Sequence, residues 1–148
     1  MKETQGGYLI SKIHQTSDRV FNRLLKEEGI GEINPAQGRI LFALWKRDDV
    51  PIKDLAKETL LHKSTLTKML DTLEESGHIQ RVYPQDNRRT VHIRLTEKNK
   101  RLRGKYEDVS EQMRTVYYRG FTGEEIDQLS ALLERVLENL VEEAGGKE

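Results

Sequence analysis

The stretch that decides the fold is residues 52–98, IKDLAKETLLHKSTLTKMLDTLEESGHIQRVYPQDNRRTVHIRLTEK. Its first part carries apolar residues at helical spacing, and its last part alternates apolar and polar residues as a strand does. A short helix that opens at Pro51 and a longer helix over 63–76, joined by three or four residues, predict a helix-turn-helix unit. Gly77 follows, where a left-handed helix cap is expected.

Two strands over 79–83 and 90–95 are expected to pair as a hairpin after this unit. The segment 78–94 holds four arginines and one aspartate, so it is locally basic. Arg88 and Arg89 stand side by side at the expected turn. Charged residues are common at exposed turns, so the pair alone does not indicate a function. Its position directly after a helix-turn-helix predicts a wing whose guanidinium groups enter a narrow minor groove.

The second helix of the unit is the candidate recognition helix. When Leu66, Leu70 and Leu73 face inward, its N-terminal end presents short hydroxyls and cations. Hydroxyl groups can bond base edges or phosphates, Thr methyls can contact thymine methyls, and lysine can pair with guanine or phosphate. A solvated polar helix face is the alternative, but the position in a helix-turn-helix favours DNA contact. The candidate DNA-contacting residues are Lys63, Ser64, Thr65, Thr67 and Lys68.

Helices are expected on both sides of this unit. Apolar spacing predicts a first helix over 8–28, and Asn34 and Pro35 suit the N-cap and first position of the next one. A long helix is expected from Thr96, and a capping box of Thr122 and Glu125 would start the last helix. The fold class is therefore mainly α (α+β), a winged helix-turn-helix with a helical lobe built from both chain ends.

Composition limits the function classes. The 148 residues fit one unit, and 34% charged residues with a mean hydropathy of −0.75 favour helices that expose charge. The absence of cysteine excludes disulfides, thiolate metal sites and cysteine nucleophiles. We expect a cytoplasmic protein with no membrane partner, because the sequence has neither a signal peptide nor an 18-residue apolar run. The zero net charge conceals an acidic end, since residues 121–148 carry eight acidic and two basic side chains.

No sequence signature of catalysis is present. The chain lacks a Gly-rich phosphate loop and the HExxH and GxSxG motifs, so we expect no enzyme and no cofactor. His14 and Asp18 lie one helical turn apart, but two ligands without a third do not make a metal site. His62, His78 and His92 are expected to contact phosphate or surface residues rather than a metal.

The stretch closely resembles the MarR (multiple antibiotic resistance regulator) family of winged-helix transcription regulators. The order of the flanking helices and the NPAQGRILFAL run at 34–44 also fit, so the resemblance covers nearly the whole chain. The most specific matches are LA at 55–56, STLTK at 64–68, LEESG at 73–77, RR at 88–89 and LTEK at 95–98. The resemblance implies that residues 64–68 face the major groove and that Arg88 and Arg89 occupy the wing tip.

The resemblance also implies an organisation and a mode of control. Within a single MarR-like unit, 1–148, residues 34–95 would form the DNA-binding lobe, and residues 1–33 and 96–148 a dimerisation lobe. A homodimer would place its recognition helices in successive major grooves, roughly 34 Å apart, on a pseudo-palindromic operator. The expected function is a repressor released by a small-molecule effector, with phenolic or aromatic compounds as the candidate class. A winged-helix protein-interaction module and a small hydrolase are the alternatives.

Three positions depart from the family pattern. Asn87 stands directly before the arginine pair, where the pattern has Asp. Leu60 occupies a turn position that often holds Gly, and Asn99 replaces the Gly that ends LTEKG. We expect the change at Asn99 to be mild, because Asn tolerates a glycine-like backbone better than most residues.

Overall fold

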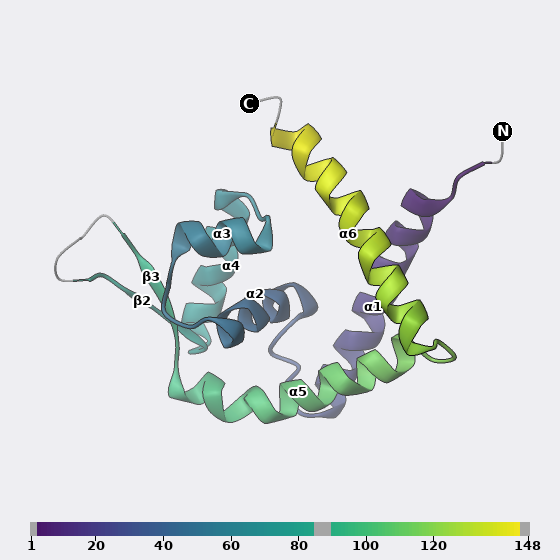
Figure 1. Cartoon of the computed structure of the whole chain (residues 1–148). Helices are drawn as coiled ribbons and strands as arrows, with labels where there is room; N and C mark the ends of the chain where they lie inside the picture. The colour runs from purple at the N-terminus through teal and green to yellow at the C-terminus, as the bar shows by residue number, and fades with distance from the viewer. Residues whose placement is uncertain (1–2, 85–89, 146–148) are drawn as a thin grey trace. The chain divides into compact units, whose positions relative to one another are not determined.

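A computed structural model describes residues 3–84 and 90–145 (Figure 1). The chain forms two compact units, residues 1–111 and 112–148, and the boundary falls inside α5. In chain order the elements are α1 (Gly6–Glu27), α2 (Pro35–Lys46), β1 (Val50–Pro51), α3 (Ile52–Thr59), α4 (Lys63–Glu75), β2 (Ile79–Val82), β3 (His92–Leu95), α5 (Glu97–Tyr117) and α6 (Gly123–Gly145).

Local signals set most of the helix ends. Asn34 Oδ1 accepts a hydrogen bond from the backbone N–H of Gln37, and the Gln37 side chain accepts one from the backbone N–H of Asn34. This reciprocal cap begins α2 at Pro35, as the sequence predicts. Gly77 adopts a φ of 81°, and the backbone N–H of His78 donates to the Leu73 carbonyl, so α4 ends in a Schellman motif.

The sheet has the order β1-β3-β2, and both pairings are antiparallel. The expected hairpin of β2 and β3 is present, but both strands are shorter than expected on the side of the turn. β2 ends at Val82 and β3 begins at His92. The strand β1 was not predicted from the sequence. Its two residues pair with Ile93 and His92 of β3, which closes the edge of the hairpin against the helix-turn-helix.

The core of the first unit lies among α2, α3, α4 and the sheet. Its fully buried side chains include Ile40, Leu44, Leu55, Leu70 and Ile93. Leucine and isoleucine at helical and strand spacing thus meet on one inner surface, and their burial is the main stabilising term for the unit.

Tyr106 of α5 extends this core towards α1 and α2. Its ring packs edge-on to Phe21, with centroids 5.6 Å apart, and against Trp45 at 4.6 Å. Gly38 of α2 leaves the space for it, because a Cβ there would lie 2.9 Å from Tyr106 Cζ. Burial raises the pKa of the Tyr106 hydroxyl well above its usual range.

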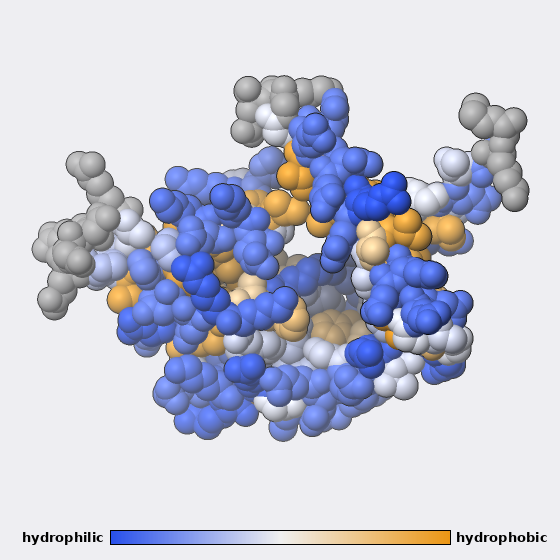
Figure 2. Space-filling view, in the orientation of Figure 1, coloured by the Kyte–Doolittle hydropathy of each residue, from blue (hydrophilic) through white to orange (hydrophobic). Residues whose placement is uncertain are grey.

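The second unit consists of the end of α5, a turn and α6. Thr122 and Glu125 cap each other's backbone N–H groups, so the expected capping box begins α6. In the described chain α6 has no buried residue, and its apolar side chains form an exposed stripe (Figure 2). The members of this stripe are Leu132, Leu133, Val136, Leu137, Leu140 and Val141.

Candidate nucleic-acid interface

The rotation of α4 is fixed by its apolar face. Leu66, Leu70 and Leu73 are at most 1% exposed, so the opposite face of α4 points to solvent. The turn before it is closed by Leu60 in the left-handed region, with φ 58° and ψ 23°. This conformation explains why glycine suits the position, since a left-handed non-glycine residue costs about 1–2 kcal/mol.

The candidate DNA-contacting residues gather in the first two turns of α4. Lys63, Ser64, Thr65 and Lys68 are exposed, and Thr67 is half-buried. Among the described residues, none of the four exposed side chains has a hydrogen-bond or ion-pair partner. They are therefore available to an external ligand.

The N-terminal end of α4 is electropositive. His62 is the N-cap residue, but its side chain makes no capping hydrogen bond, and the first turn carries no acidic residue. The first backbone N–H groups of a helix have no intrahelical partner, and the helix dipole places partial positive charge there. Lys63 and Lys68 add two cations to this end, so the arrangement favours an anionic ligand.

One carboxylate, that of Asp49, pairs with two basic residues of β3. Arg94 Nη2 donates to Asp49 Oδ2 at 3.0 Å, and His92 Nδ1 lies 3.2 Å from Asp49 Oδ1. The hydrogen bond from Arg94 holds the pKa of Asp49 below its usual value. The predicted wing-tip residues Arg88 and Arg89, with Asn87, lie outside the described residues.

Arg81 of β2 is a site residue that the sequence analysis missed. Its guanidinium donates to Asp71 at 2.7 Å, to Glu74 at 2.9 Å and to the carbonyl of Thr67 at 3.3 Å. In the sequence Arg81 is one of four arginines of the hairpin segment, whereas in the structure its guanidinium is bound along α4. Two acidic residues at 71 and 74, about one helical turn apart on the predicted helix, were the sequence signal that could have indicated a basic partner there.

A buried polar network joins the end of α4 to α2 and α5. The indole N–H of Trp45 donates to Asn99 Oδ1 at 2.9 Å, and Asn99 Nδ2 lies 3.1 Å from His78 Nδ1. Because an indole N–H can only donate, Asn99 must turn its NH₂ group to His78. His78 Nδ1 then accepts, and the proton of the neutral ring resides on Nε2.

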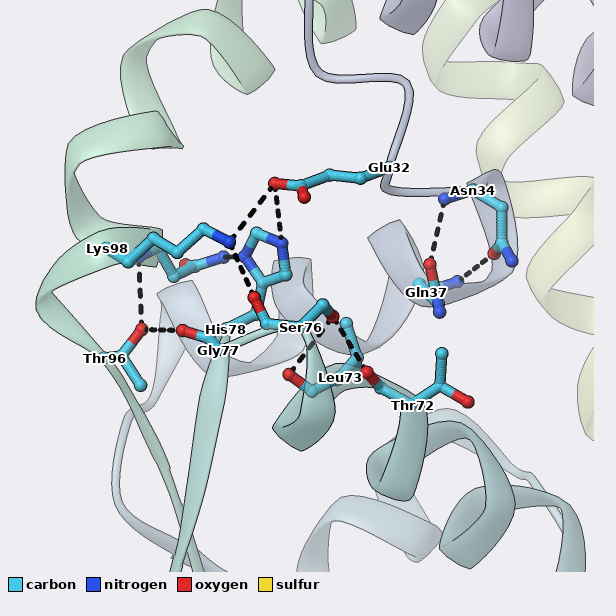
Figure 3. A network of polar contacts seen from close by, with 11 residues as sticks. Glu32, Asn34, Gln37, Thr72, Leu73, Ser76, Gly77, His78, Thr96 and Lys98 are labelled. Atoms are coloured by element: carbon cyan, nitrogen blue, oxygen red, sulfur yellow. Dashed lines mark hydrogen bonds and ion pairs between the residues drawn. The ribbon is translucent and has the colours of Figure 1, made fainter.

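The other side of His78 faces Glu32, as Figure 3 shows. His78 Nε2 lies 3.2 Å from Glu32 Oε1, but this buried atom has no partner aligned for a hydrogen bond in the described chain. Lys98 lies 3.7 Å from the same carboxylate oxygen and donates to the Ser76 carbonyl at 2.6 Å. Burial lowers the pKa of His78, and the Glu32 carboxylate only partly offsets that shift.

At two residues of this network the structure differs from what the sequence suggested. His78 is 0% exposed, so it is not a surface contact to phosphate, because the chain turns inward after Gly77. Asn99 is also 0% exposed and lies inside α5, and its φ is not positive. Its amide side chain, rather than a glycine-like backbone, is what the position uses.

The His14 and Asp18 pair has its own local partner. His14 Nε2 lies 3.7 Å from Asp18 Oδ2, and Arg39 donates to Asp18 Oδ1 at 2.7 Å. Within residues 3–84 and 90–145, no three His, Asp or Glu side chains are arranged to hold a metal ion.

A surface cavity of about 390 Å³ lies between α2 and the helix-turn-helix. Phe42, Leu61 and Met69 supply apolar walls, and the charged lining residues are Arg39, Lys46 and Glu58. Lys46 Nζ lies 4.6 Å from the centroid of the Phe42 ring. Thr65 also lines the cavity, so the cavity and the exposed face of α4 share a residue.

Sequence comparisons relate the chain to transcription regulators. The model of the MarR family matches residues 33–91. The transcriptional regulator TtmR of Methylorubrum extorquens is 31% identical over 118 residues, 80% of this chain, and the chain spans 56% of TtmR. The transcriptional repressor IacR of Pseudomonas putida is 22% identical over 94% of this chain and 81% of IacR.

The fold also has a solved counterpart. A mutant MarR from E. coli, crystallised with operator DNA, superposes with a TM-score of 0.78 at 26% identity. The match covers 88% of this chain and 92% of that chain.

In the described part of this chain, no helix is long and apolar enough to span a membrane.

Proposed function

The chain belongs to the MarR family of winged helix-turn-helix transcription regulators, and from that premise we propose that it represses transcription by binding an operator in double-stranded DNA. One observation carries the proposal. The N-terminal half of α4 presents Lys63, Ser64, Thr65 and Lys68 without partners in the described chain, on a helix whose other face is buried.

Each of these residues has a role in the proposal. Ser64, Thr65 and Thr67 contact base edges in the major groove, whereas Lys63 and Lys68 contact phosphate or guanine. The positive end of the α4 dipole supports this orientation, because it attracts phosphate to the helix end that enters the groove. The proposal also places Arg88 and Arg89 in the adjacent minor groove.

The functional unit in this proposal is a homodimer. The six residues of the α6 stripe are 38–63% exposed, and Tyr8, Leu9, Ile10 and Ile13 of α1 are 41–65% exposed. Exposed apolar stripes of this length are typical of surfaces that another chain covers. Residues 1–33 and 96–148 supply the dimerisation lobe, residues 34–95 supply the DNA-binding lobe, and two-fold symmetry makes the operator pseudo-palindromic.

Release of DNA is proposed to follow binding of a small phenolic or aromatic effector in the cavity beside Phe42. The ring would pack on Phe42, Leu61 and Met69, and an acidic or phenolate group would meet Arg39 or Lys46. Thr65 belongs to both the cavity and the DNA-contacting face of α4. An effector that binds one position of α4 more tightly than another therefore changes the affinity for DNA. The proposal places the protein in the cytoplasm and gives it no catalytic role.

A DNA titration at several salt concentrations tests the proposal. Neutralisation of phosphates predicts an affinity that falls steeply as salt rises, with a log–log slope of about −0.9 for each phosphate contacted. A flat response would contradict DNA binding and favour a protein-interaction module. The double variant of Arg88→Ala and Arg89→Ala should bind more weakly and with a shallower slope, and unchanged affinity would exclude the wing role.

A further inference from the structure

We infer that Arg81 is a positioning residue for DNA recognition, which sets the register of α4 against β2 and thereby places Thr67 for base contact. The inference rests on the proposed function and assigns Arg81 a role different from that of the wing-tip arginines. Its basis is a set of four hydrogen bonds between one residue of β2 and one face of α4.

The bonds of Arg81 use both its backbone and its side chain. Its backbone N–H donates to Glu74 Oε2 at 3.0 Å, and its Nη1 donates to Glu74 Oε1 at 2.9 Å. Its Nη2 donates to Asp71 Oδ1 at 2.7 Å and to the Thr67 carbonyl at 3.3 Å. Both carboxylate oxygens of Glu74 are therefore occupied by the same residue.

These contacts span the recognition helix. Thr67, Asp71 and Glu74 follow at intervals of four and three residues, so they lie in one row along α4. A single guanidinium that holds three points of this row resists both rotation of α4 about its axis and sliding of β2 along it. Planar guanidinium groups with several fixed donors give stronger geometric control than the point charge of lysine.

Burial separates this cluster from an ordinary surface ion pair. The side chain of Arg81 is 16% exposed, whereas those of Asp71 and Glu74 are 58% and 42% exposed. Isolated exposed pairs contribute little to stability, but a largely buried arginine that bonds two carboxylates and a carbonyl has few alternative positions.

The same bonds exclude Arg81 as a phosphate contact. Two carboxylates neutralise its charge, and its guanidinium points along α4 to residues 67–74. Its effect on DNA must therefore pass through α4. The bond to the Thr67 carbonyl reaches the backbone of a residue proposed to contact bases, and Lys68 follows directly.

Two matched substitutions test this role. Each removes one carboxylate charge from α4, but the positioning role predicts a loss of discrimination for only one of them. Asp71→Asn removes the carboxylate charge that pairs with Arg81, whereas Glu75→Gln changes an exposed residue of α4 that has no partner among the described residues. If charge alone mattered, both variants would bind DNA slightly more tightly, because each loses a repelling carboxylate. The positioning role instead predicts that only Asp71→Asn loses discrimination between the preferred site and a shuffled site, by about tenfold, the size of a lost base contact.

The salt dependence of binding gives an independent readout. Arg81→Gln should leave the log–log slope unchanged, since no phosphate contact is removed, while a direct phosphate contact would make it shallower by about 0.9. Arg81→Lys should discriminate between the preferred and the shuffled site better than Arg81→Gln does, because lysine keeps the charge. Amide hydrogen exchange at residue 81 should accelerate in Asp71→Asn and not in Glu75→Gln. Unchanged protection of the other amides of the first unit in both variants would show that both are folded.

The outcomes separate this inference from the proposed function. If wild-type protein binds DNA with a steep salt slope but Asp71→Asn discriminates as well as Glu75→Gln does, Arg81 is not a positioning residue. If Arg81→Gln makes the slope shallower, Arg81 contacts phosphate and the inference is also wrong. A wild-type protein without salt-dependent binding would overturn the proposed function itself, and with it the role assigned to Arg81.

Discussion

Replacement of Gly38 by alanine tests how α5 packs on the DNA-binding lobe. A Cβ at residue 38 would lie 2.9 Å from Cζ and 3.1 Å from Cε2 of Tyr106, and closer still to its Oη. Tyr106 is 4% exposed and is held between Phe21 and Trp45, so its ring has no free space to enter. The side chain and the helices must therefore shift.

The expected size of the effect follows from two opposing contributions. Overpacking of a well-packed core costs about 1–3 kcal/mol, and the trapped ring argues for the upper end. Alanine in place of glycine inside a helix contributes about 1 kcal/mol in the opposite direction. Gly38→Ala should therefore reduce the free energy of unfolding by about 2 kcal/mol, which urea denaturation followed by circular dichroism can measure.

Two further variants make this prediction sharp. Gly104→Ala changes a glycine of α5 whose Cβ would meet nothing within 4 Å, so it should stabilise the protein by up to about 1 kcal/mol. In a Tyr106→Leu background the obstacle is gone, and Gly38→Ala should become neutral or stabilising. If Gly38→Ala destabilises equally in both backgrounds, the contact with Tyr106 is not the cause and the packing argument fails.

The remaining predictions concern four residues. Lys68→Ala should weaken binding to every duplex and make the salt slope shallower by about 0.9, whereas Thr67→Ala should mainly relax preference among sites; competition titrations distinguish the two. His78 is held neutral by burial, so its folded pKa lies below its unfolded value, and stability should fall as the pH drops below about 6.5. Urea midpoints between pH 7.5 and 5.5 should therefore change less in His78→Gln, and equal changes would exclude His78. Leu60→Gly removes a left-handed leucine that is 54% exposed and should raise the unfolding free energy by up to about 1 kcal/mol; a loss would show that its side-chain contacts outweigh the strain.

Features coded by neighbouring residues could be predicted from the sequence. The Asn34 and Thr122 caps, the Gly77 helix end and the buried leucines of α4 depend on contacts within a few positions. Such contacts recur wherever the same short pattern occurs, so the order of helices and the helix-turn-helix followed directly. The exposed face of α4 followed from the same periodicity.

Features that depend on distant partners could not be predicted in this way. The strand β1 has two residues and exists only because β3, some forty positions later, pairs with it. Arg81 was counted only among the basic residues of the hairpin, because it meets its partners on α4 only when β2 folds back. His78 and Asn99 are polar, so the sequence placed them at the surface or in a backbone role, while the fold buries them together.

Selection of bound sequences from a random pool of duplex DNA tests the central claim most directly. A two-fold symmetric dimer with two copies of α4 predicts an enriched pseudo-palindrome whose half-sites are centred about 10 base pairs, or one helical turn, apart. Substitution of Thr67 should alter the enriched bases in both half-sites equally. Recovery of a pool with no enriched motif, or of a single asymmetric half-site, would contradict the account.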